Sequence, residues 1–312
     1  MTEKKEKYDL VIIGAGPAGL TASIYASRFG INHLVIGSLI EGRLAEANEV
    51  GNFPPDTEIS GQKLIKKMEE HAKNLNVEIK SDKVTKISKN NKGFLIETMT
   101  GKEYFTKTLL LAIGAERKKL NIPEEEKFSG KGISYCATCD GKIFTNKVVA
   151  IVGGSSATAT TADYLSDLAE TVYLIHGGAK LKADKIWQER INKNPKIKTI
   201  SDNQIKGLEG GNFLETAILE KDYQGKKELK VDGIFVEMGI APNLEIINEL
   251  GVEKDENGFI NIKSDGSTNI EGVWAAGDIT NGSNNFRQIV TANAEGAIAA
   301  SSIHPFLKKQ NN

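Results

Sequence analysis

An apolar run that leads directly into a glycine-rich turn is the strongest constraint on how this chain folds. Residues 8–13 read Tyr-Asp-Leu-Val-Ile-Ile, which is typical of a buried parallel strand, and the turn Gly14-Ala15-Gly16-Pro17-Ala18-Gly19 follows. From Leu20 to Phe29 the apolar spacing becomes helical, and Gly30 is a natural stop. Glycine here permits a tight turn, a close approach of pyrophosphate to the backbone, and close helix–strand packing. The pattern favours a dinucleotide-binding unit over an ordinary tight turn.

The next apolar run, residues 33–36, ends at Gly37. Many dinucleotide sites place an acidic residue at this point, where it binds the ribose hydroxyls. Because that acid is missing, we expect Glu41 or a main-chain group to make the ribose contact.

A second strand, turn and helix begins at residue 148. An apolar run at 148–152 precedes the turn 153–158, a helical stretch at 159–168 and another apolar run at 171–176. Ser155 stands where the second glycine of the fingerprint belongs, and Thr158 replaces its final small residue. We therefore expect the fold to persist here, with a defective nucleotide site.

The later chain supplies further residues to the first unit. Residues 259–262 and 272–279 are predicted strands, and the second of them delivers Gly277 and Asp278 to a ligand. Asp278 is a candidate to hydrogen-bond a cofactor sugar or polyol, although a turn or helix-cap aspartate is the alternative. The predicted fold class is α/β, with two dinucleotide-binding, Rossmann-like domains, the second inserted into the first.

The only two cysteines of the 312 residues, Cys136 and Cys139, are three positions apart. Without further cysteines for a structural framework, the pair favours a reversible dithiol. Half of a zinc site is the less favoured reading, because the four histidines show no paired spacing (His33, His71, His176 and His304). We expect no metal.

Composition limits the partners and the compartment. The 40 basic and 41 acidic residues give no global bias toward nucleic acid, so no nucleic-acid partner is expected. The charged N-terminus lacks the apolar core of a signal peptide, and no apolar run approaches the roughly 18 residues of a membrane span. We therefore expect a cytoplasmic protein without a membrane partner.

Taken in order along the chain, the motifs resemble those of the low-molecular-weight thioredoxin reductases, which are FAD enzymes. The resemblance covers essentially the full length. It is carried by residues 14–19, Asn52-Phe53-Pro54, Leu111-Ala112-Ile113-Gly114-Ala115, Cys136 to Gly141, Gly239-Ile240-Ala241-Pro242-Asn243, Ala275 to Ile279, and Arg287 to Ala292.

The resemblance implies a discontinuous FAD-binding domain of residues 1–113 and 243–312. Residues 114–242 would form the inserted, nicotinamide-domain-like redox domain. Family members are homodimers. The cofactor-binding positions carried over are Gly14, Gly16, Ala18 and Gly19 for the pyrophosphate, Asp278 for the ribityl side, Arg287 and Gln288 for the isoalloxazine ring, and Glu41, Arg43, Leu44, Asn52, Ala115, Gly277 and Ile289 nearby.

The family mechanism assigns roles to the dithiol. Reduced flavin passes two electrons to the Cys136–Cys139 disulfide; Cys139 faces the flavin and Cys136 attacks thioredoxin through a mixed disulfide. Asp140 is similar to the family's proton donor and acceptor. A helix that follows the motif would favour the thiolate form. One departure is Glu41-Gly42-Arg43-Leu44, where the family usually has Gly-Gly-Gln-Leu.

A second departure concerns the electron donor. The family's NADPH site has a complete glycine fingerprint and a His-Arg-Arg stretch with another arginine beyond, whereas this chain has Ser155, Thr158, His176-Gly177-Gly178 and Lys182. Losing both arginines removes the bidentate donors that recognise a 2′-phosphate, so NADPH binding is doubtful. The chain is most similar to the ferredoxin-dependent flavin thioredoxin reductases, and reduced ferredoxin is the expected donor.

Other readings stay open. A nicotinamide donor such as NADH would use Lys180 and Lys182 in place of the arginines. A flavin dithiol oxidase would act on a small molecule and pass electrons to oxygen, and a redox sensor would not turn over thioredoxin. Residues 180–198 hold seven basic side chains against two acidic ones, which either steer an acidic ferredoxin or form a solvated lysine face.

Overall fold

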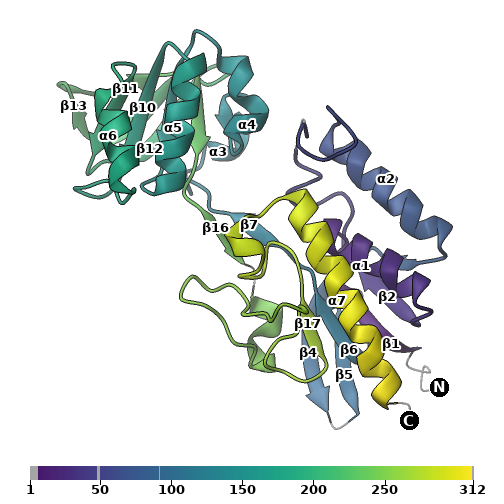
Figure 1. Cartoon of the computed structure of the whole chain (residues 1–312). Coiled ribbons are helices and arrows are strands. Elements are labelled where there is room, and N and C mark those ends of the chain that lie inside the picture. The colour runs from purple at the N-terminus through teal and green to yellow at the C-terminus, as the bar shows by residue number, and fades with distance from the viewer. Residues whose placement is uncertain (1–5, 48–49, 91, 243, 311–312) are drawn as a thin grey trace. The chain divides into compact units, whose positions relative to one another are not determined.

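The computed structural model describes residues 6–47, 50–90, 92–242 and 244–310 (Figure 1). The chain divides into two compact units, residues 1–116 with 241–312, and residues 117–240. The boundaries drawn from the sequence are 113/114 and 242/243. Asn243, where the predicted FAD domain resumes, lies outside the described residues. Each unit is described by itself.

The first unit is built on a mixed sheet in the order β3-β2-β1-β6-β5-β4. The strands are β1 (Glu6–Ile13), β2 (His33–Ile36), β3 (Glu78–Lys80), β4 (Val84–Asn90), β5 (Gly93–Thr98), β6 (Glu103–Leu111) and β17 (Val273–Ala275). The first half of β6 pairs antiparallel with β5, and its last three residues pair parallel with β17. Residues 273–275 are thereby brought beside the strand that ends near the glycine turn.

Side chains of β1 alternate between the two faces of this sheet, as the period of a strand requires. Leu10 and Ile12 pack into one core with the helices, and Val11 and Ile13 into the core on the opposite face. All four are buried, so the continuous apolar run of β1 reflects burial on both faces.

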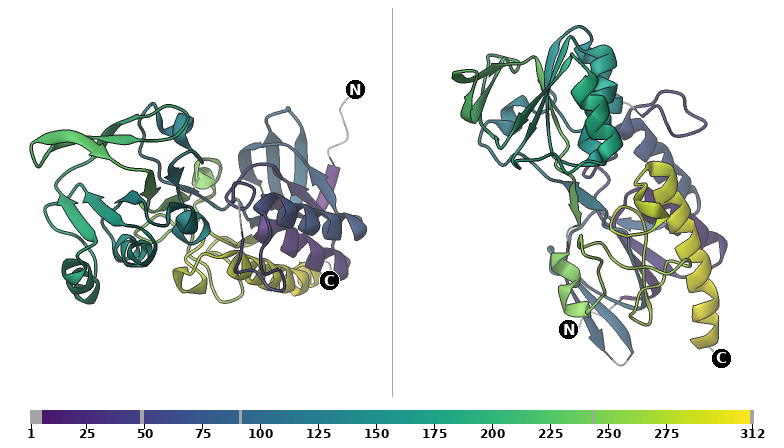
Figure 2. Two further views of the ribbon diagram at one scale, coloured as in Figure 1. Left: turned by 90° about the horizontal axis from the view of Figure 1, so that it is seen from above. Right: turned by 60° about the vertical axis from the view of Figure 1, so that its left-hand side comes forward.

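Three helices belong to the first core: α1 (Pro17–Arg28), α2 (Gly61–Asn74) and α7 (Ile289–Gln310). Helices α1 and α7 lie side by side, as Figure 1 and both views of Figure 2 show. Gly296 makes this approach possible, because a Cβ there would lie 2.2 Å from the Ala18 carbonyl oxygen. Helix α1 begins at Pro17, three residues before the expected start at Leu20.

The opposite face is covered by the short 3₁₀ helix η2 (Glu245–Leu250) and by irregular chain up to η3 (Ser283–Asn285). The strand expected at residues 259–262 was wrong: only Ile260 makes bridges, to Lys254 and Thr280. The strand expected at 272–279 shortens to β17. Both segments read as strands because they are apolar. Gly277, at positive φ, interrupts the second segment, and the first follows directly on a turn at Gly258, which is also at positive φ.

The second unit has a fully parallel sheet in the order β11-β10-β9-β15-β8 and an antiparallel sheet β12-β13-β14. Its strands are β8 (Ile133–Ser134), β9 (Val148–Val152), β10 (Thr171–His176), β11 (Ile197–Ser201), β12 (Ile205–Glu209), β13 (Thr216–Tyr223), β14 (Lys226–Lys230) and β15 (Gly233–Val236). Its helices are α3 (Glu125–Phe128), α4 (Ala137–Asp140), η1 (Gly141–Phe144), α5 (Ser156–Leu168) and α6 (Lys185–Lys193).

Helices α5 and α6 supply buried side chains to one core of this unit, and the antiparallel sheet supplies the other. The two segments that connect the units, β7 (Ala115–Arg117) and β16 (Ile240–Pro242), pair as a two-stranded ladder. The predicted α/β class with two Rossmann-like sheets, the second inserted in the chain of the first, is confirmed.

Candidate cofactor and redox sites

The glycine turn of the first unit is shaped by close backbone packing. Gly14 has φ of +111°, and a Cβ there would lie 2.2 Å from the Ala112 carbonyl oxygen. At Gly19 a Cβ would lie 1.9 Å from the Gly14 carbonyl oxygen. Both positions therefore require glycine for the turn and for helix–strand packing, as the fingerprint predicts.

Gly16 differs, because a Cβ built there meets no atom of the described chain within 4 Å. Gly16 is the N-cap of α1, and no side chain of the described residues caps this helix. The main-chain N–H groups of the first turn of α1 therefore have no side-chain acceptor among the described residues. An uncapped helix start after a glycine turn is typical of sites that bind phosphate groups.

Gly37 explains why the expected ribose-binding acid is missing. A Cβ at Gly37 would lie 2.6 Å from the Ala15 main-chain nitrogen. Any side chain at the end of β2 would push the glycine turn away from the strand. Glu41, the proposed substitute, is exposed, and Leu44 is buried in the helical core.

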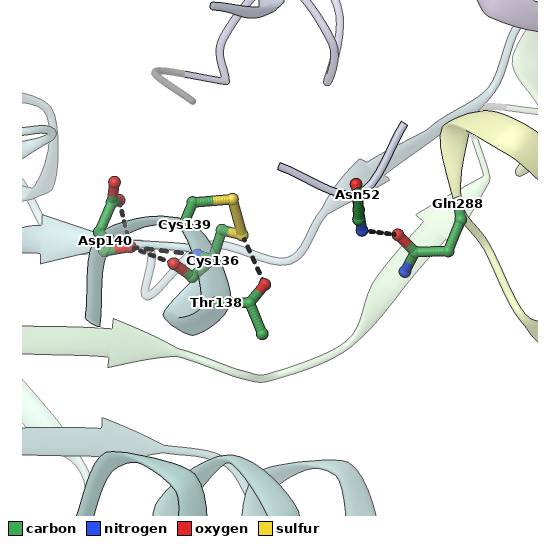
Figure 3. Close-up of a disulfide and its surroundings, with 7 residues drawn as sticks. Asn52, Cys136, Thr138, Cys139, Asp140 and Gln288 are labelled. Atoms are coloured by element: carbon green, nitrogen blue, oxygen red, sulfur yellow. Dashed lines mark hydrogen bonds between the residues drawn. A yellow bond between two sulfur atoms is a disulfide. The ribbon is translucent and has the colours of Figure 1, made fainter. Parts of the chain in front are cut away.

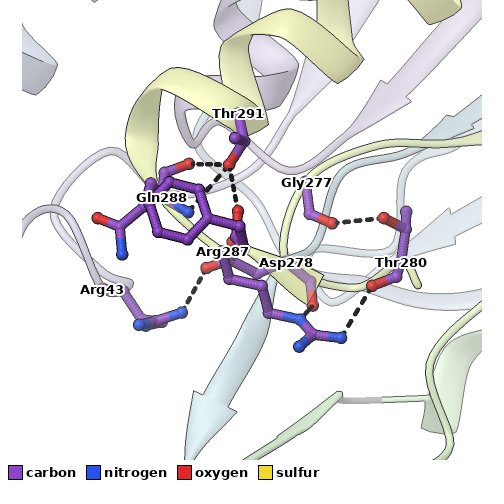
Figure 4. A network of polar contacts seen from close by, with 8 residues as sticks. Arg43, Gly277, Asp278, Thr280, Arg287, Gln288 and Thr291 are labelled. Carbon is purple, nitrogen blue, oxygen red and sulfur yellow. Dashed lines mark hydrogen bonds and ion pairs between the residues drawn. The ribbon is translucent and has the colours of Figure 1, made fainter. Parts of the chain in front are cut away.

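Several predicted cofactor residues meet in one polar cluster of the first unit (Figure 4). Arg43 Nη1 donates to Asp278 Oδ2 at 2.5 Å. Arg287 donates from Nε to the Asp278 carbonyl oxygen at 3.3 Å and from Nη2 to the Thr280 carbonyl oxygen at 3.1 Å. Asn52 Nδ2 donates to Gln288 Oε1 at 3.0 Å. Residues far apart in sequence therefore converge beside the C-terminal ends of the strands.

The cluster carries two guanidinium groups and one carboxylate. Burial lowers the pKa of Arg287 from its ordinary value, and the negative charge of Asp278 opposes that change. Arg43 Nε is buried and has no hydrogen-bond partner among the described residues. A buried donor without an acceptor is rare in a folded protein, so this atom fits a site whose ligand supplies an acceptor. The charge and the orphaned donor both suit an anionic ligand.

Glu295, which sequence reasoning missed, holds the loop that carries Asp278. It is buried in α7 and accepts hydrogen bonds from Gly277 N (2.8 Å), Thr280 Oγ1 (2.9 Å) and Ser283 Oγ (2.6 Å). The available signal was that Glu295 is the only acidic residue of the described helix α7, between the small residues Ala294 and Gly296. Ala115 is buried at the start of β7, and Ile289 is the first residue of α7.

The two cysteines form a disulfide in the second unit, with a Cα–Cα distance of 5.3 Å (Figure 3). Cys136 is the N-cap of α4, and the N–H groups of Cys139 and Asp140 both donate to its carbonyl oxygen. Its sulfur lies 3.5 Å from Thr138 Oγ1. The helix expected after the motif is replaced by two short turns: α4 includes Cys139 itself, and only the four-residue 3₁₀ helix η1 follows it. Helices this short provide only a weak dipole.

Ser134, also missed from the sequence, contacts both ends of this motif. Its Oγ donates to Asp140 Oδ2 at 2.6 Å and accepts from Cys136 N at 3.1 Å. Within the described chain, the hydrogen bond to the Asp140 carboxylate thus comes from Ser134 rather than from a cysteine. A serine two residues before Cys136 carries no recognisable pattern, and its role appears only with the chain folded.

The turn of the second unit is closed by its own side chains. Ser155 Oγ caps α5 by accepting from Thr158 N at 3.4 Å, and Thr158 Oγ1 accepts from Ser155 N at 3.3 Å. Thr158 Oγ1 also donates to the Glu237 carbonyl oxygen at 3.2 Å. Ser155 occupies the position that Gly16 has in the first unit, namely the N-cap of the helix.

A neighbouring segment also lies against this helix start. Lys182 N donates to the Gly154 carbonyl oxygen at 2.8 Å. Ser156 Oγ donates to Asp184 Oδ2 at 2.9 Å, which holds a carboxylate beside the first residue of α5. Negative charge at this point repels a phosphate that approaches the same helix end.

The basic segment 180–198 is partly engaged within its own unit. Lys196 Nζ donates to the carbonyl oxygens of Ser166 and Ala169, at 2.9 and 3.0 Å. Arg190 pairs with Asp163 at 3.4 Å. Lys180, Lys182, Lys185 and Lys193 have exposed side chains.

The described part of the chain contains no group of three or more histidine, cysteine, aspartate or glutamate side chains that is able to hold a metal ion. None of its helices has the length and apolarity needed to cross a membrane.

Two Rossmann-type sheets, one with an open glycine turn and the other with a Cys-x-x-Cys disulfide, define the class of nucleotide-binding disulfide oxidoreductases. The chain belongs to the pyridine nucleotide-disulphide oxidoreductase family, whose model matches residues 8–296.

Its relatives include a 34.2 kDa protein in the rubredoxin operon of Clostridium pasteurianum, 40% identical over 96% of this chain and 97% of that protein. The thioredoxin reductase of Bacillus subtilis is 35% identical over 99% of this chain and 97% of its own length.

Solved structures of thioredoxin reductases are also similar to this chain. The thioredoxin reductase of Streptococcus pyogenes has a TM-score of 0.83 at 32% identity, covering 98% of this chain and 100% of that chain. A ferredoxin-flavin thioredoxin reductase from Clostridium acetobutylicum has a TM-score of 0.53 at 29% identity, covering 98% of this chain and 100% of that one.

Proposed function

We propose that this chain is an FAD-dependent thioredoxin reductase. It passes electrons from FAD through the Cys136–Cys139 dithiol to thioredoxin, with reduced ferredoxin as the donor. Full-length similarity to proteins named thioredoxin reductase supports the reductase activity. The self-capped turn at Ser155 and Thr158 is the observation that carries the donor assignment.

The residues of the first unit fit FAD. Gly14, Gly16, Ala18 and Gly19 would hold the pyrophosphate at the uncapped start of α1, where Gly16 leaves open space. Asp278 would contact the ribityl side, and Arg287 with Gln288 the isoalloxazine ring. Arg43 Nε is a donor without a partner among the described residues, and an oxygen or nitrogen of the cofactor would satisfy it.

The remaining predicted cofactor residues would surround these contacts: Glu41, Leu44, Asn52, Ala115, Gly277 and Ile289. When bound, FAD would supply the two-electron carrier between the donor and the disulfide.

The dithiol would carry out the exchange with thioredoxin. In the proposed sequence the Cys136 thiolate attacks the substrate disulfide and forms a mixed disulfide, and one substrate sulfur leaves as a thiolate. The Cys139 thiolate then attacks the Cys136 sulfur, which restores the enzyme disulfide and releases the second substrate thiolate. Two electrons and two protons are transferred in total, and Asp140 would supply and recover protons at the sulfurs.

The second unit argues against a nicotinamide donor. Where a dinucleotide site needs bare backbone, this unit has a capping box whose hydroxyls already satisfy each other and Glu237. The Asp184 carboxylate adds repulsion at the same helix end. The similarity to a protein named ferredoxin-flavin thioredoxin reductase supports the same choice.

An anaerobic titration tests the donor. We expect NADPH and NADH to leave the flavin absorbance oxidised, and photoreduced ferredoxin to bleach it and to generate thioredoxin thiols. Dithionite serves as the control that the flavin is reducible. Rapid bleaching by micromolar NADPH would overturn the donor assignment and leave the reductase intact. Oxygen consumption with a small dithiol, without thioredoxin turnover, would favour the oxidase reading.

Two cysteine variants test the dithiol roles. Cys139→Ser should abolish thioredoxin reduction and retain FAD, and Cys136→Ser should do the same while keeping the flavin-facing thiol. Only Cys136→Ser is then expected to show a flavin–thiolate charge-transfer absorbance. If the charge-transfer absorbance appears in Cys139→Ser instead, Cys136 faces the flavin and Cys139 attacks thioredoxin. Loss of FAD from folded Cys139→Ser would contradict the proposal.

The proposal extends to the assembly and the donor surface. By resemblance, the chain is a homodimer of the cytoplasm, which light scattering of the purified protein and cell fractionation would test. The exposed lysines of the basic segment would attract an acidic ferredoxin, so raising ionic strength should slow its reaction. A ferredoxin rate that does not change with salt would exclude this steering.

A further inference from the structure

Ser134 lies at the end of a buried strand and directly before the redox motif. It is 4% exposed, and its backbone is held in the parallel sheet by the pairing of β8 with β15, opposite Phe235. From this fixed point the hydroxyl donates to Asp140 Oδ2 at 2.6 Å and accepts from Cys136 N at 3.1 Å. The Ser134 oxygen also lies 3.3 Å from the Cys136 carbonyl oxygen.

We propose that Ser134 is the positioning residue that fixes the Asp140 carboxylate relative to the first cysteine. The inference rests on the proposed function, in which Asp140 moves protons at the dithiol. Ser134 does not itself contact the substrate disulfide. It acts through Asp140.

The need for such a residue follows from the elements around it. Asp140 is the last residue of α4, a single turn of four residues that continues into the equally short η1, and helices this short are marginal on their own. The side chain of Asp140 is half-buried, so rotation about its χ angles toward solvent is open to it. The bond to a strand-anchored hydroxyl removes that freedom at the position where the proton is needed.

The direction of the bonds strengthens the contact. Because the Ser134 oxygen accepts from the Cys136 N–H, its own O–H is polarised and donates more strongly to the carboxylate. The same hydroxyl thus couples the backbone of the attacking cysteine to the proton-carrying side chain.

A double-mutant cycle on the holoenzyme tests this role. The rate constant for reduction of oxidised thioredoxin by dithionite-reduced enzyme is measured for the wild type, Ser134→Ala, Asp140→Asn and the double variant. We expect Ser134→Ala to slow exchange about tenfold or more, since misplacing a catalytic group is costly. In the Asp140→Asn background, Ser134→Ala should change the rate less than about twofold. Additive effects would overturn the proposal.

Two matched variants distinguish a specific role of the Ser134 hydroxyl from a nonspecific effect of substitutions near the motif. Tyr135→Phe removes a hydroxyl from the adjacent residue that donates at 2.6 Å to Glu125, and it should leave the exchange rate within about twofold. Ser134→Thr keeps the hydroxyl and should retain most of the rate. A loss in Tyr135→Phe equal to that in Ser134→Ala would contradict a specific role.

Asp140→Glu provides the test if Ser134→Ala does not fold. It keeps a carboxyl group but displaces it from Ser134 by one methylene, so about tenfold slower exchange is expected. A rate equal to that of the wild type would refute positioning. The double-mutant cycle can also be measured by the rate at which Cys136 is alkylated in the reduced protein. This measurement uses no thioredoxin, so it tests the role of Ser134 even if the wild-type enzyme does not reduce thioredoxin.

Discussion

Ser155 and Thr158 satisfy each other at the start of α5: each main-chain N–H donates to the other residue's hydroxyl, at 3.3 and 3.4 Å. At the same position of the first unit, Gly16 leaves the start of α1 without a side-chain cap. The corresponding turns of the two units therefore differ: α5 is capped by side chains of its own unit, whereas α1 has no side-chain cap among the described residues. The turn of the second unit is closed, and that of the first is left open to a ligand.

Thr158→Val should destabilise the second unit without creating a nucleotide site. The variant keeps the shape of the side chain but loses the acceptor for Ser155 N and the donor to the Glu237 carbonyl oxygen. We expect a loss of about 1–2 kcal/mol in the free energy of unfolding, from urea denaturation. Calorimetry with NADPH should detect no heat of binding, because Asp184 remains. A gain in NADPH affinity would show that the hydroxyls alone close the site.

Alanine substitutions at two glycines of the first turn should have different effects. A Cβ at Gly16 projects into open space at an ordinary φ of −80°, so Gly16→Ala should fold normally and weaken FAD binding about tenfold. A Cβ at Gly19 would lie 1.9 Å from the Gly14 carbonyl oxygen, so Gly19→Ala should lower stability by about 3 kcal/mol.

Flavin fluorescence after ultrafiltration measures FAD affinity, and thermal unfolding of the apoprotein measures stability. Equal FAD affinity in Gly16→Ala and the wild type would mean that no group of the ligand approaches this main chain.

The strands and turns of both units were predictable because their signals are local. Residues 8–13 and 148–152 are apolar on both faces and lead into glycines, and the structure forms β1 and β9 there. Residues 259–262 carry the same apolar signal but form no strand, since pairing partners that lie far apart in sequence decide whether an apolar segment joins a sheet.

The candidate site was predictable only in part, for a related reason. Gly16, Cys136 and Cys139 belong to spaced motifs, so the sequence indicates them directly. Ser134 acts by donating a hydrogen bond to Asp140, and Glu295 acts by accepting one from Gly277 N. The fold brings these partners together, and a single serine or glutamate has no spacing to recognise. The Arg43–Asp278 pair joins residues 235 positions apart, which no local pattern contains.

Arg43→Gln should weaken FAD binding while leaving the second unit unchanged. The substitution removes the guanidinium that pairs with Asp278 and the buried Nε donor that has no partner in the described structure. We expect the dissociation constant for FAD to rise about tenfold, as for loss of one charge-assisted hydrogen bond.

Arg43→Lys is the matched control for charge. Lysine keeps the positive charge but lacks both the planar fork and the Nε donor, so it should not restore the affinity. Full recovery with lysine would mean that charge alone matters at this position. Unchanged affinity in both variants would remove Arg43 from the cofactor site.

His33 should make the folded protein less stable in mild acid. Burial lowers the pKa of His33 below its ordinary value of 6.5, and its Nδ1 donates to the Ile31 carbonyl oxygen at 2.9 Å. Above pH 6.5 the ring is neutral in both folded and unfolded chains, so stability is independent of this group. As the pH falls below 6.5, the unfolded chain takes up the proton first, and the free energy of unfolding decreases until the pH passes the folded pKa.

In His33→Asn the side-chain amide can still donate to the Ile31 carbonyl oxygen, but nothing titrates. Urea denaturation at pH 7.5 and 5.5 should therefore show a smaller loss of stability in this variant than in the wild type, by at most about 1.4 kcal/mol per pH unit. Burial also lowers the pKa of His176, so His176→Asn should reduce the acid loss with the same sign in the second unit. If the free energy of unfolding falls equally in the wild type and in His33→Asn between these two pH values, the prediction is wrong. His33 would then take up a proton as readily in the folded state as in the unfolded chain.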